Sequence, residues 1–300
     1  MFFGQALQYD EGVNYLSFTF VVFCRFLSSF VGKLFLFSCY ALHMDTREVL
    51  QLKISYLIYV IKNLPRGWIG IHRGQEVAVV TYDPEDRSIT PGKYRRFCTK
   101  NKKGSYYKEK IESYIRANDE LTKLMTEWRS VYRDEPEIIN FPLDRTIVSG
   151  ISERYYKASL SNQNAAPIKY PISYKGQILR SKNEMMAIQL IEQLGFDWKT
   201  EIHICVGKNN MYPDVTFLVP YLQKAIGLEI DGMMEQYDYY TKAQTRQYNY
   251  LSSGFSDYKD ILFFRLSENN AFDAIALKTM IERAIALNAA EIIERMKYSV

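Results

Sequence analysis

The second half of the chain alternates between helical and strand patterns in a fixed order, and this order restricts the possible folds most strongly. Apolar residues recur at helical spacing in three segments and in strand-like runs in four others. Gly195 and Gly254 mark the ends of the first two helical segments. The expected helices are 181–194, 235–251 and 271–287, and the expected strands are 196–206, 214–219, 225–231 and 260–266. The order α-β-β-β-α-β-α predicts an α/β fold of the α+β type.

Acidic residues stand at the ends of two neighbouring strand candidates. Tyr212-Pro213-Asp214 leads into the second strand, and Glu229-Ile230-Asp231 ends the third. If these strands form a hairpin centred near Tyr221–Leu222, Asp214 lies opposite residues 229–230, and Glu229 and Asp231 share a face. Carboxylates this close repel one another unless a cation neutralises them. Mg²⁺ or Mn²⁺ is the expected cation, because both bind oxygen ligands.

The small numbers of histidines and cysteines restrict the kinds of metal site that the chain can form. The chain has three histidines and four cysteines, without a CxxC pair. This excludes a histidine-rich metal site, a zinc ribbon and a thioredoxin-type site. A simpler alternative is that Asp214 caps a turn while Glu229 and Asp231 end a strand in solvent. The apolar residues between these acids favour strands that enter a core instead.

Two segments combine basic and aromatic side chains. Four of them recur at steps of three, four and four along the helix at 235–251 and form one stripe: Tyr239, Lys242, Arg246 and Tyr250. Such a stripe suits a nucleic-acid strand that passes beside the carboxylates. Residues 93–116 carry nine lysines and arginines against two glutamates. That stretch is either a solvated helix face or a phosphate-contacting patch, with these candidates: Arg95, Arg96, Lys100, Lys102 and Lys103.

The same residues resemble the PD-(D/E)XK nuclease superfamily, and most closely an uncharacterised bacterial and phage-borne group of its members. The resemblance covers roughly residues 44–270 and implies a restriction-endonuclease-like αβββαβ core with a mixed central sheet. The matching segments are Ser181-Lys182-Asn183-Glu184, Tyr212-Pro213-Asp214-Val215, Glu229-Ile230-Asp231-Gly232-Met233-Met234, the helix residues Tyr239, Lys242 and Tyr250, and Ser253-Gly254.

This resemblance implies a role for each matching position. Asp214 and Glu229 would bind the metal, with the backbone carbonyl of Ile230 as a further ligand and Glu184 completing or orienting the metal shell. Asp231 is an additional candidate ligand, and it stands where the family usually has a lysine. We expect Lys242 to replace that lysine, with Lys182 as the second choice and as a further nucleic-acid contact. If neither reaches the site, the domain would be a catalytically inactive nucleic-acid-binding module.

The N-terminal segment differs in composition from the rest of the chain. Residues 13–42 are apolar and rich in phenylalanine, but Arg25 and Lys33 interrupt them. A membrane-spanning helix needs about 20 predominantly apolar residues with few or no charges. Three interpretations stay open: an extension outside the native protein, with translation beginning at Met44, a membrane helix, or a core helix.

The expected domains follow from these patterns. Residues 1–43 form the hydrophobic extension, residues 44–156 a domain with a helix, a β-hairpin around Arg73-Gly74-Gln75 and a long helix at 107–132, and residues 172–290 the nuclease-like domain. A polar linker at 157–171 separates the last two.

The functional expectation is a Mg²⁺-dependent DNA endonuclease, bacterial or phage-encoded and cytoplasmic, without an organic cofactor. The net charge of +4 permits an anionic partner but does not require one. Many nucleases of this fold act as dimers to cut both strands, so a homodimer is a candidate state. The alternatives are an inactive nucleic-acid-binding or interaction module on the same fold, and a membrane-tethered protein if residues 13–42 are a native helix.

Overall fold

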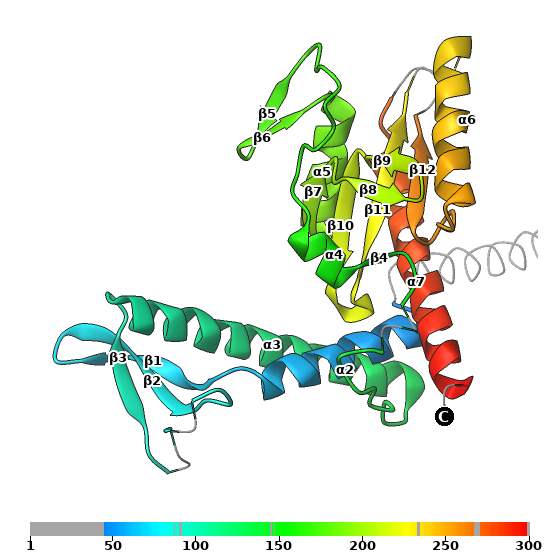
Figure 1. The fold of residues 1–300 in the computed structure, drawn as a ribbon. Coiled ribbons are helices and arrows are strands. Elements are labelled where there is room, and N and C mark those ends of the chain that lie inside the picture. Colours follow the sequence, from blue (N-terminus) through cyan, green and yellow to red (C-terminus); the bar gives the residue numbers. More distant parts are fainter. Residues whose placement is uncertain are drawn as a thin grey trace, which may run out of the picture. The chain divides into compact units, whose positions relative to one another are not determined.

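The computed structural model describes residues 45–298 except 87, 90–91, 145, 147, 233–234 and 267–270 (Figure 1). Contacts divide the chain into two units, residues 1–45 and 46–300, and the described elements belong to the second. The extension at 1–43, with the candidate membrane segment at 13–42, lies outside the described residues, as do Met233 and Met234. No helix in the described part of the chain is long and apolar enough to cross a membrane.

The first elements agree with the expected helix and hairpin. α2 (Arg47–Lys62) follows Thr46, whose side chain caps it by accepting the N–H of Val49. β1 (Arg66–His72) and β2 (Gln75–Tyr82) form an antiparallel hairpin. The two turn residues, Arg73 and Gly74, both have positive φ, which is the backbone that a tight type I′ hairpin turn requires.

The basic stretch contributes a third strand that the sequence pattern did not predict. β3 (Arg95–Cys98) pairs with β2, which gives a sheet in the order β1-β2-β3. α3 (Lys102–Tyr132) begins earlier than Tyr107, because Asn101 caps it by accepting the N–H of Gly104. One face of the sheet packs against α3 through apolar side chains: Ile69, Ala78, Val80, Phe97, Tyr107 and Ile111.

The second half has the expected element order, and the predicted α+β class is confirmed. The elements are α5 (Lys182–Gln193), β7 (Asp197–Thr200), β10 (Val215–Val219), β11 (Lys224–Asp231), α6 (Tyr237–Ser252), β12 (Ile261–Arg265) and α7 (Ala274–Tyr298). The strands form a mixed sheet in the order β12-β11-β10-β7. β7, β10 and β11 are antiparallel neighbours, whereas β12 is parallel to β11. A parallel pair needs a crossover connection, and α6 provides it.

Local structure differs from the expectation at several short elements. The strand expected at 196–206 breaks at Glu201, which has positive φ, into β7 and β8 (Ile204–Val206). β8 pairs with β9 (Asn209–Met211) in a short hairpin, and β9 lies outside the expected strands. The remaining short elements were not predicted: β4 (Ile151–Ser152), α4 (Glu153–Ala158), β5 (Ile172–Tyr174), β6 (Gln177–Leu179) and the 3-10 helix η1 (Pro220–Leu222).

Side chains alternate between the two faces of the mixed sheet, and this alternation positions the acids. Val215, Phe217 and Val219 face the core that α5 and α7 share. Leu218 and Ala225 face the other side, where they pack with Tyr250 of α6. By the same alternation Glu229 and Asp231 lie on the α6 side of β11.

Candidate functional site

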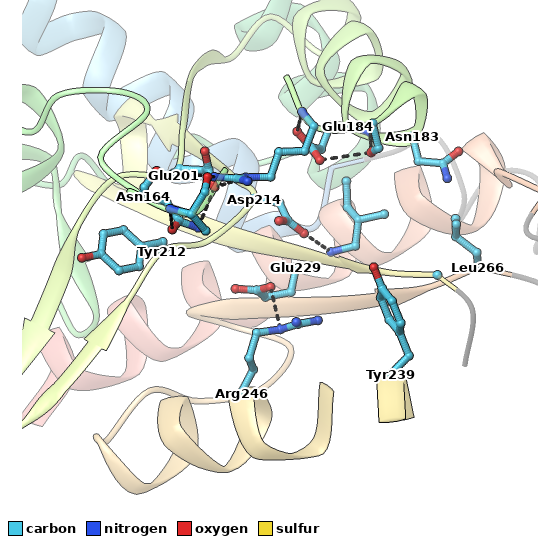
Figure 2. A pocket seen from close by; sticks show the side chains of 15 residues that line it. Asn164, Asn183, Glu184, Glu201, Tyr212, Asp214, Glu229, Tyr239, Arg246 and Leu266 are labelled. Carbon is cyan, nitrogen blue, oxygen red and sulfur yellow. Dashed lines mark hydrogen bonds and ion pairs between the residues drawn. The ribbon is translucent and has the colours of Figure 1, made fainter. Parts of the chain in front are cut away.

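A cavity of about 700 Å³ opens at one end of the mixed sheet (Figure 2). Its lining comes from α5, α6, β11 and the segments beside them. Four carboxylates line it: Glu184, Glu201, Asp214 and Glu229. The structure therefore brings together the three carboxylates that the sequence had placed on a helix and two strands.

The hairpin of β10 and β11 sets the positions of Asp214 and Glu229. Val215 pairs with Leu228, so the preceding Asp214 lies beside the start of the segment Glu229–Ile230. Asp214 Oδ2 accepts the N–H of Ile230 at 2.7 Å. The expected register, with residue 214 opposite residues 229–230, is confirmed by this pairing.

Glu184 reaches the cavity from the first turn of α5. Ser181 caps this helix by accepting the N–H of Glu184 at 3.1 Å. In return, Glu184 Oε2 accepts the N–H of Arg180 at 2.9 Å, one residue earlier than a standard capping box would use. Burial, followed by the negative charge of Asp214, raises the pKa of Glu184 to about 7.

The two strand acids are also destabilised as anions. Burial raises the pKa of Asp214 to about 6, although the Ile230 N–H and the positive charge of Arg246 act in the opposite direction. Burial and the charge of Asp214 raise the pKa of Glu229 well above its usual value. These carboxyl groups need either protons or a cation to lie together in this cavity.

Arg246 on α6 forms ion pairs with the strand acids Glu229 and Asp231. Its Nη2 donates to Asp231 Oδ1 at 2.5 Å, and its Nε lies 3.3 Å from Glu229 Oε2. One helical turn later, the hydroxyl of Tyr250 donates to Glu229 Oε1 at 2.7 Å. Tyr250 is only 2% exposed, so it supports Glu229 rather than presenting a ring to a nucleic-acid strand.

The lysines that were candidates for the missing family lysine do not line the cavity. Lys242 is exposed on α6, and Lys182 is exposed at the start of α5. Tyr239, from the same predicted stripe, does line it. The other predicted nucleic-acid residues are all exposed, on β3 and around the start of α3: Arg95, Arg96, Lys100, Lys102 and Lys103.

A polar cluster at the cavity edge was missed by the sequence analysis. Glu201 Oε1 accepts from Arg180 Nε at 2.6 Å and from Asn164 Nδ2 at 2.8 Å. These residues lie in three separate segments with no shared motif, so no sequence signal could have joined them. Tyr212 and Asn183 complete this polar side of the lining.

The carboxylate oxygens of the cavity are suitable ligands for a hard cation, although they are not arranged as a preformed metal site. Within the described ranges, no three His, Cys, Asp or Glu side chains form a group that could hold a metal ion. The carboxylates nevertheless supply only oxygen ligands, as Mg²⁺ or Mn²⁺ prefers. Asp214 engages one oxygen with Ile230, and Arg246 lies against Glu229.

Comparison with known proteins does not identify a family: no family model, curated protein or solved structure matches the chain.

Proposed function

We propose that this protein is a metal-dependent nuclease that hydrolyses phosphodiester bonds, with DNA as its substrate. The observation that carries the proposal is that Glu184, Asp214 and Glu229 line the same cavity. They come from a helix and two adjacent strands. The α-β-β-β-α-β order and mixed sheet support a restriction-endonuclease-like core of the PD-(D/E)XK kind.

Asp214 and Glu229 would hold the metal, with Glu184 and the Ile230 carbonyl as further ligands. Bound Mg²⁺ would lower the pKa of a coordinated water and offset the negative charge that develops on the phosphate. The chain itself orients these acids, because Ile230 fixes one oxygen of Asp214 and Tyr250 fixes one oxygen of Glu229. Such fixed second partners strengthen a metal site.

Arg246 replaces the expected lysine in this proposal. Its guanidinium balances Glu229 and Asp231 and lines the cavity, where it is available to a phosphate. Arginine keeps its charge at any physiological pH and binds phosphate oxygens through two parallel N–H donors. Arg246 is thus suited to stabilising charge on the phosphate rather than to exchanging protons.

Cleavage of supercoiled plasmid DNA tests the proposal. The full chain should nick or linearise the plasmid with Mg²⁺ and not with EDTA, and Asp214→Asn should abolish the activity. Asp119→Asn, an exposed carboxylate on α3, is the matched control and should cleave like the unmodified protein. Equal cleavage by the unmodified protein and Asp214→Asn would contradict the proposal.

A non-catalytic nucleic-acid-binding module on the same fold is the second candidate. The observation in its favour is that Asp231 stands at the lysine position and is bound to Arg246, while no lysine is among the residues that line the cavity. This candidate predicts DNA binding that weakens with salt and survives Asp214→Asn, without turnover in Mg²⁺ or Mn²⁺.

Dimerisation, a cytoplasmic location and membrane tethering through residues 13–42 stay predictions. Fractionation of the full chain against a form starting at Met44 checks the last of these. Equal distribution of both forms in the soluble fraction would contradict tethering.

A further inference from the structure

We propose that the β1-β2-β3 sheet carries a second binding surface, which takes an unpaired stretch of nucleic acid. The two faces of this sheet differ. α3 packs on one face, through the apolar cluster around Ala78 and Val80. The opposite face presents Trp68, Tyr94 and Arg96, and none of these lines the carboxylate cavity.

The register places Trp68 and Arg96 in one row across the sheet. Trp68 pairs with Val79 of β2, and Val79 pairs with Arg96 of β3. Residues that pair in this way point to the same face, and this face is opposite to that of Ala78. The indole and the guanidinium therefore flank Val79 on the face away from α3.

Two aromatic rings lie open on this face. Trp68 is 51% exposed and Tyr94 is 52% exposed, and their ring centroids are 6.4 Å apart. A Cβ added at Gly70, two residues along β1, would lie 3.5 Å from the indole, which is an ordinary contact distance, so the Trp68 ring extends along the strand beside Gly70. Arg96 lies 4.9 Å from the Tyr94 ring centroid and donates to the Tyr94 hydroxyl oxygen at 2.9 Å.

Charge complementarity identifies a polyanion as the partner. Arg96 lies against the Tyr94 ring on this face, and the neighbouring Lys93 and Arg95 are exposed. Glu76 of β2 is paired with Lys108, on the α3 side. Aromatic rings that stack on bases, next to cations that contact phosphates, are the combination that binds single-stranded nucleic acid. An uncharged apolar peptide would offer no anion to Arg96.

This inference extends the proposed function, because a nuclease needs to hold its substrate, but binding at the sheet does not require a competent cavity. The test uses the full chain in EDTA and fluorescein-labelled oligothymidylate of about 20 nucleotides, which is longer than a typical single-strand site. Fluorescence anisotropy gives the affinity at several salt concentrations.

Two variants separate stacking from charge. Trp68→Ala should weaken binding about tenfold or more without changing the salt dependence. Arg96→Ala should reduce the slope of log affinity against log salt by about 0.7. Ile71→Ala is the matched control, since Ile71 is an exposed apolar residue of the same strand whose alternation places it on the other face. It should bind like the unmodified protein.

Tryptophan fluorescence reports the surface directly. Of the three tryptophans, Trp128 is buried and Trp198 is half-buried, so quenching by the oligonucleotide should come from Trp68. Trp68→Phe should keep most of the affinity and lose the quenching. Unchanged affinity in Trp68→Ala, or equal weakening in Ile71→Ala, would overturn the inference.

The cleavage assay separates this inference from the proposed function. A protein that binds through Trp68 but never cleaves would contradict the nuclease and leave the binding surface standing. If the unmodified protein cleaves DNA and the Trp68→Ala variant binds the oligonucleotide normally, the nuclease proposal stands and the binding surface is contradicted.

Discussion

Tyr250 of α6 donates its phenolic hydrogen to Glu229 Oε1 of β11 at 2.7 Å, in a position where both side chains are buried. Arg246, one helical turn earlier, lies against the other carboxylate oxygen at 3.3 Å. The helix that makes the parallel crossover between β11 and β12 thereby holds a cavity acid through both of its oxygens. The connection that completes the sheet also orients the candidate site.

Tyr250→Phe should weaken the site while leaving the fold intact. The variant keeps the ring contacts with Phe255 and Phe263 but leaves a buried carboxylate oxygen without its donor. We expect a loss of about 1–3 kcal/mol in the free energy of unfolding, measured with urea. In a nuclease, the Mg²⁺ concentration for half-maximal cleavage should rise by roughly 10–100-fold. Tyr156→Phe, in the same apolar cluster, should leave the Mg²⁺ requirement unchanged.

Arg246→Gln should destabilise the metal-free protein at pH 8, because Glu229 and Asp231 lose their counterion. The loss should be about 1–2 kcal/mol, below that of a fully buried pair, since the Arg246 side chain is 41% exposed. Adding Mg²⁺ should restore more stability to this variant than to the unmodified protein. Arg129→Gln, which breaks an exposed pair with Glu135, should cost at most about 1 kcal/mol. Equal stability of the two variants in EDTA would contradict the prediction.

The pKa of Glu184 predicts a pH dependence of stability in EDTA. Because the pKa rises to about 7 on folding, the folded state binds the proton more tightly than the unfolded state. This contribution is complete below about pH 4.5 and is lost as pH rises through about 7, with a total of about 3 kcal/mol. The urea midpoint of Glu184→Gln should change less between pH 5 and pH 8 than that of the unmodified protein. If the stability of the variant depends on pH as strongly as that of the unmodified protein, Glu184 is not the source of this pH dependence.

Lys224→Met should be the most destabilising of these changes. Lys224 Nζ donates to Asp260 Oδ1 at 2.6 Å and to Asn288 Oδ1 at 2.7 Å, in the interior between β11 and α7. Removing the amine leaves a buried carboxylate unpaired, which typically costs about 3–5 kcal/mol. Adding Asp260→Asn to the variant should recover part of the loss in urea unfolding. No recovery would show that packing, rather than the unpaired charge, is responsible.

The sequence predicted the elements that have long periodic patterns. α2, the β1-β2 hairpin, α5, the β10-β11 hairpin, α6 and β12 lie where apolar spacing and turn residues place them. α7 begins near its expected start but continues to Tyr298, past the expected end at residue 287. The pattern failed at short elements such as β3, β5 and β6. Strands of three or four residues contain too few positions to establish a period, and β3 begins with two exposed arginines.

The sequence by itself determined which acids can meet. Strand pairing has a period of two, so Asp214 comes opposite Glu229 once the hairpin forms, and Glu229 and Asp231 share a face. Only the tertiary structure decided which cation faces them. Lys242 and Arg246 are one helical turn apart on α6, and the packing of that helix over β11 brings Arg246 to the acids and leaves Lys242 in solvent. The rotation of a helix about its axis depends on contacts with distant segments, and local spacing does not contain them.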